Sequence, residues 1–382
     1  MRIVRARSAL VLVTTLVLGC GGSSAPESSP PLPTPLGQPL NGLTVGQWNW
    51  VPFPDAVCGD GSATGIGVNP GTGSDLVLFL DGGGACSSGL TCFGGLAFGT
   101  VVPKTVTTLG PFGEAEFSAR VGSTAAGSIV DRTLAGNPFA TATLVLVPYC
   151  TGDVHGGDRV VAYNDFASGT VHHAGHANVL AYLKRIAATY PAPTRVILTG
   201  SSAGGFGTIV NYESVRAYYP VAQGVVVDDS GPLLENNGGL LIQAGLQSWG
   251  ISDIFVPLCG AGVCDGANAN LSKGMTALLQ KYPQDRFALL SWDIDDIINA
   301  FYFTTFAGTP DPATTFAPQL RAMLGDVFDP APNGRYFVAA APSTGRHVLL
   351  DNPAAVSQGG VSLLSWLAQE VTGSAPPASV KP

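Results

Sequence analysis

The chain has 382 residues, of which 46% are hydrophobic and 12% are charged, and its formal net charge is −8. This apolar content is enough for a large buried core and excludes a disordered protein or a disulfide-stapled miniprotein. The acidic balance offers no basic face to phosphates, which argues against a nucleic-acid partner.

Residues 1–20 have the pattern of a signal peptide. Three arginines precede an apolar run over residues 9–18, which is too short to cross a bilayer. The run ends in Val-Leu-Gly-Cys, which resembles a bacterial lipobox with Cys20 as the lipidated first mature residue. We therefore expect an exported protein, either anchored to the cell envelope membrane by this lipid or secreted.

The next segment, residues 21–39, is rich in Pro and Ser and is predicted to form an extended tether. Folding is then expected to begin near residue 40. We predict one catalytic domain over residues 40–375, which we expect to be monomeric, and a disordered tail over 376–382. No later segment is long and apolar enough to cross a membrane.

Six short, continuous apolar runs are predicted as strands covered on both faces. They lie at residues 76–80, 144–147, 195–198, 225–227, 287–290 and 336–339. Helical patterns lie at residues 174–189, 204–219, 268–281 and 360–371. This alternation predicts a doubly wound α/β domain with a mostly parallel sheet and helices on both faces. A dinucleotide-binding glycine motif and a P-loop are both missing from the sequence.

Seven cysteines in an exported chain indicate disulfides rather than a metal site. With Cys20 assigned to lipid, six remain. Short separations favour two local pairs and leave the other two cysteines to each other. The predicted disulfides are Cys86–Cys92, Cys259–Cys264 and Cys58–Cys150, although the sequence alone does not fix this pairing.

Three histidines near residue 174 are candidate metal ligands. His172 and His176 have the spacing of one helix face, with His173 between them. A zinc-protease helix needs Glu directly after its first His, and here His173 follows. We therefore expect a solvated or hydrogen-bonded helix start without a metal.

Residues 200–204 read Gly-Ser-Ser-Ala-Gly and fit the Gly-x-Ser-x-Gly pattern of a nucleophile elbow. A predicted buried strand precedes them and a helix rich in small residues follows, which is the context that the motif requires. The pattern predicts that Ser202 is exposed as a nucleophile at the carboxyl end of the sheet.

A serine nucleophile needs a base that is oriented by an acid, and on this fold they follow in the order Ser, Asp or Glu, His. His347 is the only histidine beyond Ser202, so it is the predicted base. The residues alone leave the acid open. The candidates are Asp228 and Asp229 after one strand, and Asp293, Asp295 and Asp296 after the next.

The oxyanion of such a reaction is usually held by two backbone N–H groups. Ala203, directly after the nucleophile, is expected to supply one. The strand over 76–80 runs into Asp-Gly-Gly-Gly-Ala-Cys, and the backbone of Gly83 or Gly84 in this loop is expected to supply the other.

Several motifs together resemble the pectin acetylesterase and Notum family of carboxylesterases. They are Leu-Asp-Gly-Gly-Gly-Ala-Cys at 80–86 with Cys92 six positions on, Asn-Pro-Phe at 137–139, Pro-Tyr-Cys-Thr-Gly-Asp-Val-His-Gly-Gly-Asp at 148–158, Gly-Ser-Ser-Ala-Gly-Gly at 200–205, Asp-Ser-Gly at 229–231 and Trp-Asp-Ile-Asp at 292–295. They occur in the family's order over roughly residues 45–350.

The resemblance implies an α/β-hydrolase fold with the triad Ser202, Asp295 and His347. It favours Asp295 because the family's acid lies three residues past the Trp of the last motif, and it leaves Asp229 and Asp296 in reserve. Many relatives have Trp where this chain has Ala85, so we expect a wider pocket beside the acyl group.

These features predict an exported serine carboxylesterase that hydrolyses small acyl esters, such as acetyl groups on a polysaccharide, through an acyl-enzyme and without a metal or cofactor. One alternative is a polyester or lipid esterase with the same triad and an apolar groove. The other is a surface lipoprotein that binds carbohydrate but has lost catalysis.

Overall fold

The computed structural model describes most of the chain beyond the predicted signal peptide and tether. The described residues are 36–97, 100–123, 125–235, 240–260, 263–264, 270–304, 308–342 and 346–382. Residues 1–20, with Cys20, therefore lie outside them. Every helix among the described residues is too short or too polar to cross a membrane.

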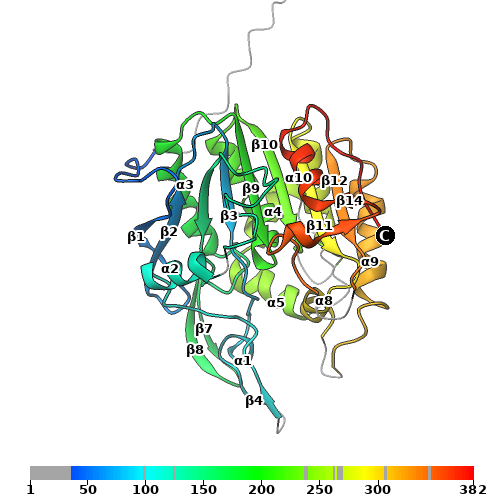
Figure 1. Ribbon diagram of the computed structural model, residues 1–382. Helices are drawn as coiled ribbons and strands as arrows, with labels where there is room; N and C mark the ends of the chain where they lie inside the picture. Colours follow the sequence, from blue (N-terminus) through cyan, green and yellow to red (C-terminus); the bar gives the residue numbers. More distant parts are fainter. Residues whose placement is uncertain are drawn as a thin grey trace, which may run out of the picture. The chain divides into compact units, whose positions relative to one another are not determined.

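An eight-stranded sheet forms the centre of the fold (Figure 1). Its strands, in spatial order, are β1 (Asn49–Val57), β2 (Ala63–Asn69), β6 (Thr143–Val147), β3 (Leu76–Leu80), β9 (Arg195–Ser201), β10 (Gln223–Asp229), β11 (Arg286–Trp292) and β12 (Gly334–Ala339). β2 pairs antiparallel with both neighbours, and the pairs from β6 to β12 are all parallel. The doubly wound α/β fold predicted from the apolar runs is confirmed.

The continuous hydrophobicity of the strands follows from their burial on both faces. Along β3, Val77 and Phe79 pack into one core cluster, and Leu76, Leu78 and Leu80 pack into the other. Each apolar side chain of such a strand leaves water, which stabilises the fold by roughly 25 cal/mol for every Å² of apolar surface buried.

Helices cover both faces of the sheet. One core cluster receives buried or half-buried side chains from α3 (Gly175–Thr189), α4 (Ala203–Tyr218), α5 (Leu240–Trp249), α6 (Ser252–Cys259), α7 (Ser272–Lys281), α8 (Asp296–Phe303) and α9 (Phe316–Met323). The other receives them from α2 (Glu114–Ser123) and α10 (Leu363–Thr372). Shorter helices are α1 (Gly89–Phe93), a π-helical turn at Leu324–Phe328 and a 3₁₀ turn at Pro353–Ala355.

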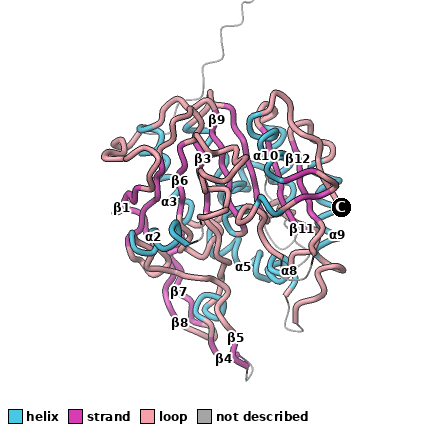
Figure 2. The backbone as a smooth tube through the Cα atoms, viewed as in Figure 1, coloured by secondary structure: helices cyan, strands magenta, loops and turns pink. Residues whose placement is uncertain are grey.

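Two small antiparallel hairpins lie outside the central sheet, and the sequence did not predict them. They are β4 (Gly95–Ala97) with β5 (Thr100–Val102), and β7 (Arg159–Asn164) with β8 (Ser168–His173). Figure 2 shows both projecting from the same end of the sheet. A third hairpin joins β13 (Ser357–Gln358) to β14 (Val361–Ser362).

The two predicted flexible ends pack against the domain where the structure describes them. The last residues of the predicted tether lie on α3, where the N–H of Gly37 donates to the carbonyl of Lys184 at 3.0 Å. The tail expected to be disordered over 376–382 instead follows β12: the N–H of Val338 donates to the carbonyl of Val380 at 2.8 Å. β12 is an edge strand, and its free N–H and C=O groups bond to the tail. The sequence of the tail does not reveal this pairing.

The structure contains the three disulfides that the cysteine spacing favours, Cys58–Cys150, Cys86–Cys92 and Cys259–Cys264. The first joins the residue after β1 to a residue beyond β6 across 92 positions of the chain. It therefore ties the antiparallel edge of the sheet to its centre.

Glu370 on α10 has a buried carboxyl group and is not one of the predicted catalytic residues. Its side chain is inaccessible to water, and neither carboxylate oxygen has a hydrogen-bond partner within the described part of the chain. Burial raises its pKa to about 7, although the positive charges of Arg286 and Arg335 oppose that rise. The folded protein therefore holds this proton more tightly than the unfolded chain does.

We predict that Glu370→Gln stabilises the protein above pH 7 and has little effect near pH 4. Between about pH 4.5 and pH 7 the unfolded chain loses the proton of Glu370 while the folded protein keeps it, which lowers the free energy of unfolding by on the order of 3 kcal/mol. Urea unfolding of both proteins at pH 4 and pH 8 measures the difference. Equal destabilisation by the substitution at both pH values would contradict the prediction.

Candidate active site

Ser202 lies at the sharp turn between β9 and α4. Its φ is +59° and its ψ is −119°, a strained conformation for a residue with a side chain. The N–H of Ser202 donates to the carbonyl of Asp229 at 2.7 Å, and this bond holds the turn against the end of β10. The side chain is half-buried and faces a cavity.

The neighbouring glycines are required by close backbone contacts. A Cβ on Gly204 would lie 1.9 Å from the carbonyl oxygen of Leu80, and one on Gly200 would lie 2.6 Å from the same oxygen. Any larger residue at either position would push α4 away from β3. The Gly-x-Ser-x-Gly pattern is thus explained by the packing of the helix on the sheet.

His347 and Asp295 form a hydrogen-bonded pair. Nδ1 of His347 donates to Oδ2 of Asp295 at 2.7 Å, and Asp295 is completely buried. The other oxygen, Oδ1, accepts the N–H groups of Ile297 and Ile298 at 3.0 and 2.9 Å, so the carboxylate caps the N-terminus of α8. The helix dipole and these donors favour its negative charge and fix its orientation toward the imidazole.

The second imidazole nitrogen of His347, Nε2, is the one available to act on a substrate or a nucleophile. Nε2 of His347 is inaccessible to solvent and has no hydrogen-bond partner among the described residues. His347 and Ser202 line the same cavity. A buried nitrogen without a partner is costly, which is typical of a group kept ready for a substrate or a nucleophile.

The carboxylate of Asp229 contacts the backbone beyond His347. It accepts the N–H groups of Leu349 and Leu350 at 2.9 Å and the hydroxyl of Ser201 at 2.9 Å. Burial raises the pKa of Asp229 to about 6, whereas its hydrogen bonds act in the opposite direction. Asp229 therefore positions the chain that carries His347.

The other reserve acid, Asp296, is the first residue of α8 and is half-buried. Asp293 accepts the N–H of Ala341 at 2.7 Å. Of the five candidate acids, Asp295 is the one that the structure places on the imidazole.

The glycine loop after β3 also lines the cavity. Gly84 pairs with Val106 in an isolated antiparallel bridge, and the N–H of Thr107 donates to the carbonyl of Gly83 at 2.9 Å. A Cβ on Gly84, whose φ is +78°, would lie 2.0 Å from the carbonyl oxygen of Thr105. The N–H groups of Gly83, Gly84 and Ala203 have no acceptor among the residues that the structure describes.

Four contacts fix the far end of this loop. The N–H of Cys86 donates to the carbonyl of Gly152 at 2.9 Å, and the carbonyl of Cys86 accepts the indole N–H of Trp249 at 2.8 Å. The third contact is the Cys86–Cys92 disulfide. In the fourth, the hydroxyl of Thr105 donates to the carbonyl of the buried Ala85 at 2.6 Å. The loop is therefore held rigidly, as preorganised oxyanion donors require.

The cavity between these groups has a volume of about 610 Å³. Its wall includes the side chains of Tyr149, Phe112 and Ile297, together with the cations Lys104 and Arg120. Arg120 forms a bidentate ion pair with Asp81, with bonds of 2.7 and 2.8 Å. The cavity thus offers both apolar surface and polar groups beside the serine.

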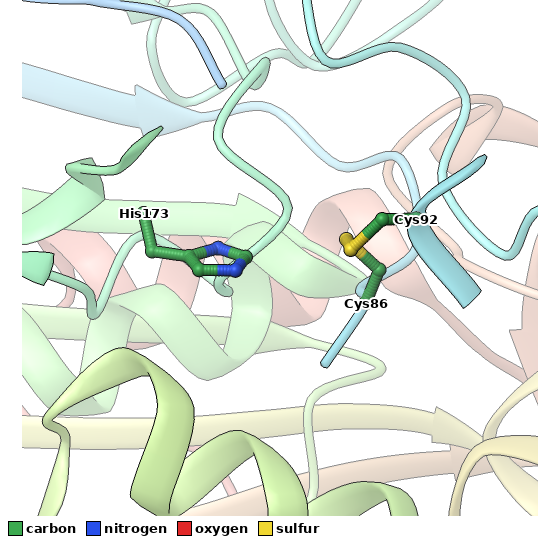
Figure 3. A group of neighbouring side chains, drawn as sticks. All are labelled: Cys86, Cys92 and His173. Atoms are coloured by element: carbon green, nitrogen blue, oxygen red, sulfur yellow. A yellow bond between two sulfur atoms is a disulfide. The ribbon is translucent and has the colours of Figure 1, made fainter. Parts of the chain in front are cut away.

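His173 lies beside the Cys86–Cys92 disulfide, as Figure 3 shows. The ligand atoms of these three residues lie within 4.8 Å of one another. The two sulfur atoms, however, are bonded to each other, and the nitrogens of His173 lie 2.9 Å from the Thr151 carbonyl and from the Tyr163 hydroxyl. Burial lowers the pKa of His173, so the neutral imidazole acts as a structural link in this cluster.

The other two histidines of this region are separate from that cluster. His172 and His173 are the last two residues of β8 and do not start a helix, whereas His176 lies in the first turn of α3. Nδ1 of His176 donates to the side chain of Asn211 at 2.8 Å.

Sequence reasoning assigned no individual role to the residues of the segment 104–108 or to Arg120. The segment holds the glycine loop and lines the cavity, yet it contains no chemical motif and is separated from the loop by α1 and a hairpin. The Gly-Gly-Gly run was the one local sign that another segment must support this loop. A glycine backbone has no side chains to hold it in place, so its N–H and C=O groups need partners elsewhere.

Comparison with known proteins agrees with this geometry. The family model described as pectinacetylesterase matches residues 51–243, about half of the chain. This match includes the glycine loop and the Ser202 turn. No curated protein matches the chain. The chain belongs to the pectinacetylesterase family and is thus a carboxylic-ester hydrolase.

Proposed function

We propose that the protein is a serine carboxylesterase that removes acetyl groups from a polysaccharide outside the cytoplasm. The observation that carries the proposal is the His347–Asp295 pair: Nε2 of His347 has no hydrogen-bond partner among the described residues, and His347 lines the same cavity as Ser202. The strained turn at Ser202 supports the same role, since such strain is typical of nucleophile elbows.

In the proposed reaction, Nε2 of His347 takes the proton of Ser202 as Oγ attacks the ester carbonyl carbon. The N–H groups of Ala203 and of Gly83 or Gly84 stabilise the negative oxygen of the tetrahedral intermediate. His347 then protonates the leaving alcohol, and the acyl group remains on Ser202. Water, deprotonated by His347, releases the acid in a second, equivalent step. Asp295 holds the imidazole tautomer and stabilises its positive charge.

The substrate proposal rests on the size and lining of the cavity. A volume of about 610 Å³ exceeds the needs of an acetyl group and leaves room for part of a sugar leaving group. The polar groups of its wall can bond to sugar hydroxyls, and apolar side chains lie beside them. These polar groups belong to Lys104, Arg120 and the threonines at 105, 107 and 108.

Export is also part of this proposal. Three disulfides are typical of proteins that fold in an oxidising compartment. Together with the signal-peptide pattern over 1–20, they support a lipoprotein anchored through Cys20 in the bacterial cell envelope.

We predict that Ser202→Ala lowers kcat/KM for p-nitrophenyl acetate by at least about 10⁴-fold, and that Asp295→Asn lowers it by about 10³–10⁴-fold. Residues 36–382 are assayed with p-nitrophenyl acetate and butyrate, acetylated pectin and acetylated xylan. Asp296→Asn is the matched control and retains activity. Full activity of Ser202→Ala would refute the assignment of Ser202 as the nucleophile. Preference for butyrate over acetate would favour a polyester or lipid esterase. Inactivity of the wild-type protein on every ester would favour a protein that binds carbohydrate without catalysis.

We further predict that Asp229→Asn lowers kcat about tenfold to a hundredfold and leaves KM nearly unchanged, because an amide accepts fewer of the N–H groups that hold the chain next to His347. A purely structural role would instead lower the amount of folded enzyme without altering kcat per active site. Titration of active sites with a slow acylating ester separates the two cases.

A further inference from the structure

A second groove lies along β1, at the edge of the central sheet. Its volume is about 540 Å³, and its lining includes Trp48, Trp50, Asn41, Glu114 and Arg185. We call this feature the β1 groove. Nothing in the proposed reaction uses these residues.

The β1 groove adjoins the catalytic cavity. The ring of Trp50 lies 6.4 Å, between centroids, from the ring of Phe112, which lines the cavity with Ser202. α2 also connects the two: Glu114 at its start lines the groove, and Arg120 two turns later lines the cavity. A polymer bound in the cavity can therefore continue along aromatic surface into the groove.

The polar groups of the β1 groove are available to a ligand. The indole N–H groups of Trp48 and Trp50 and the carboxylate of Glu114 have no hydrogen-bond or ion-pair partner among the described residues. Arg185 stacks on Phe53 at 4.7 Å and donates through Nε to the carbonyl of Gln38, which leaves the terminal nitrogens of its guanidinium without a described partner. The negative charge of Glu114 and the positive charge of Arg185 offset each other in the groove.

The aromatic side chains are held in place before any ligand binds. Phe117 packs against Trp50 at 5.3 Å and against the edge of Trp48 at 5.8 Å. The side-chain amide of Asn49, between the two tryptophans, donates to the carbonyls of Gln47 and Val68 at 2.7 and 3.1 Å. Such preorganised aromatic surface binds a ligand with little loss of side-chain entropy.

We propose that the β1 groove is a distal subsite for sugar rings of the polysaccharide whose ester group occupies the catalytic cavity. The C–H face of a pyranose would pack on an indole, and its hydroxyl groups would bond to Glu114, Arg185 and the indole N–H groups. This assignment of ligand rests on the proposed function. It explains why two indole rings and polar groups without a described partner line one groove outside the cavity.

The test uses Trp48→Ala and Glu114→Ala, with Val221→Ala as a control at a residue that is 84% exposed and outside both sites. We expect KM for acetylated xylan or acetylated pectin to rise about fivefold to tenfold in both groove variants, and kcat/KM for p-nitrophenyl acetate to stay unchanged. Thermal unfolding checks that each variant folds. Should Trp48→Ala fail to fold, Glu114→Ala, whose side chain is exposed, still decides the question.

A binding measurement separates the groove from the chemistry. Ser202→Ala protein, with and without each groove substitution, is titrated with the same two polymers and followed by tryptophan fluorescence or calorimetry. Affinity lowered about fivefold to tenfold by the groove substitutions supports the subsite even if no esterase activity is found. Equal polymer affinity and equal polymer KM in all variants would overturn it.

Discussion

The site depends on Asp229, because this residue connects the two parts of the chain that must meet. Its carbonyl accepts the N–H of Ser202, and its carboxylate accepts the N–H groups of Leu349 and Leu350, directly beyond His347. β10 ends at Asp229, between β9 and β11 in the sheet. The nucleophile turn and the histidine loop are thus fastened to one residue, although 145 positions separate Ser202 from His347 in the chain.

Two buried carboxylates have different tasks here. Asp295 caps α8 with one oxygen and orients His347 with the other, so its charge is stabilised by a helix N-terminus. Asp229 forms no ion pair with any residue that the structure describes, and burial raises its pKa to about 6 in spite of its backbone donors. The first acts on the imidazole directly, and the second fixes the backbone that carries it.

The sequence predicted the parts of this structure whose signal is local. β3 coincides with the apolar run over 76–80, and the Ser202 turn follows from small residues between a strand and a helix. β1 gave no such signal: it contains Pro52 and Pro54, which an edge strand tolerates because one side of its backbone is unpaired.

Features that arise from long-range contacts could not be predicted in the same way. The choice of Asp295 over Asp229 depended on family resemblance, because both follow strands that end at the same edge of the sheet. The ion pair of Arg120 with Asp81 and the support of Gly84 by Val106 join segments with no shared pattern. Only the folded chain shows which of them meet.

The most direct measurement is covalent labelling with diethyl p-nitrophenyl phosphate, followed by intact-mass analysis and peptide mapping. Attack by an activated serine releases p-nitrophenolate and leaves one diethylphosphoryl group on the enzyme. The account predicts one adduct per chain, on Ser202, formed far more slowly when Asp295 is replaced by Asn. A label on another residue, or no label while the enzyme still hydrolyses p-nitrophenyl acetate, would contradict it.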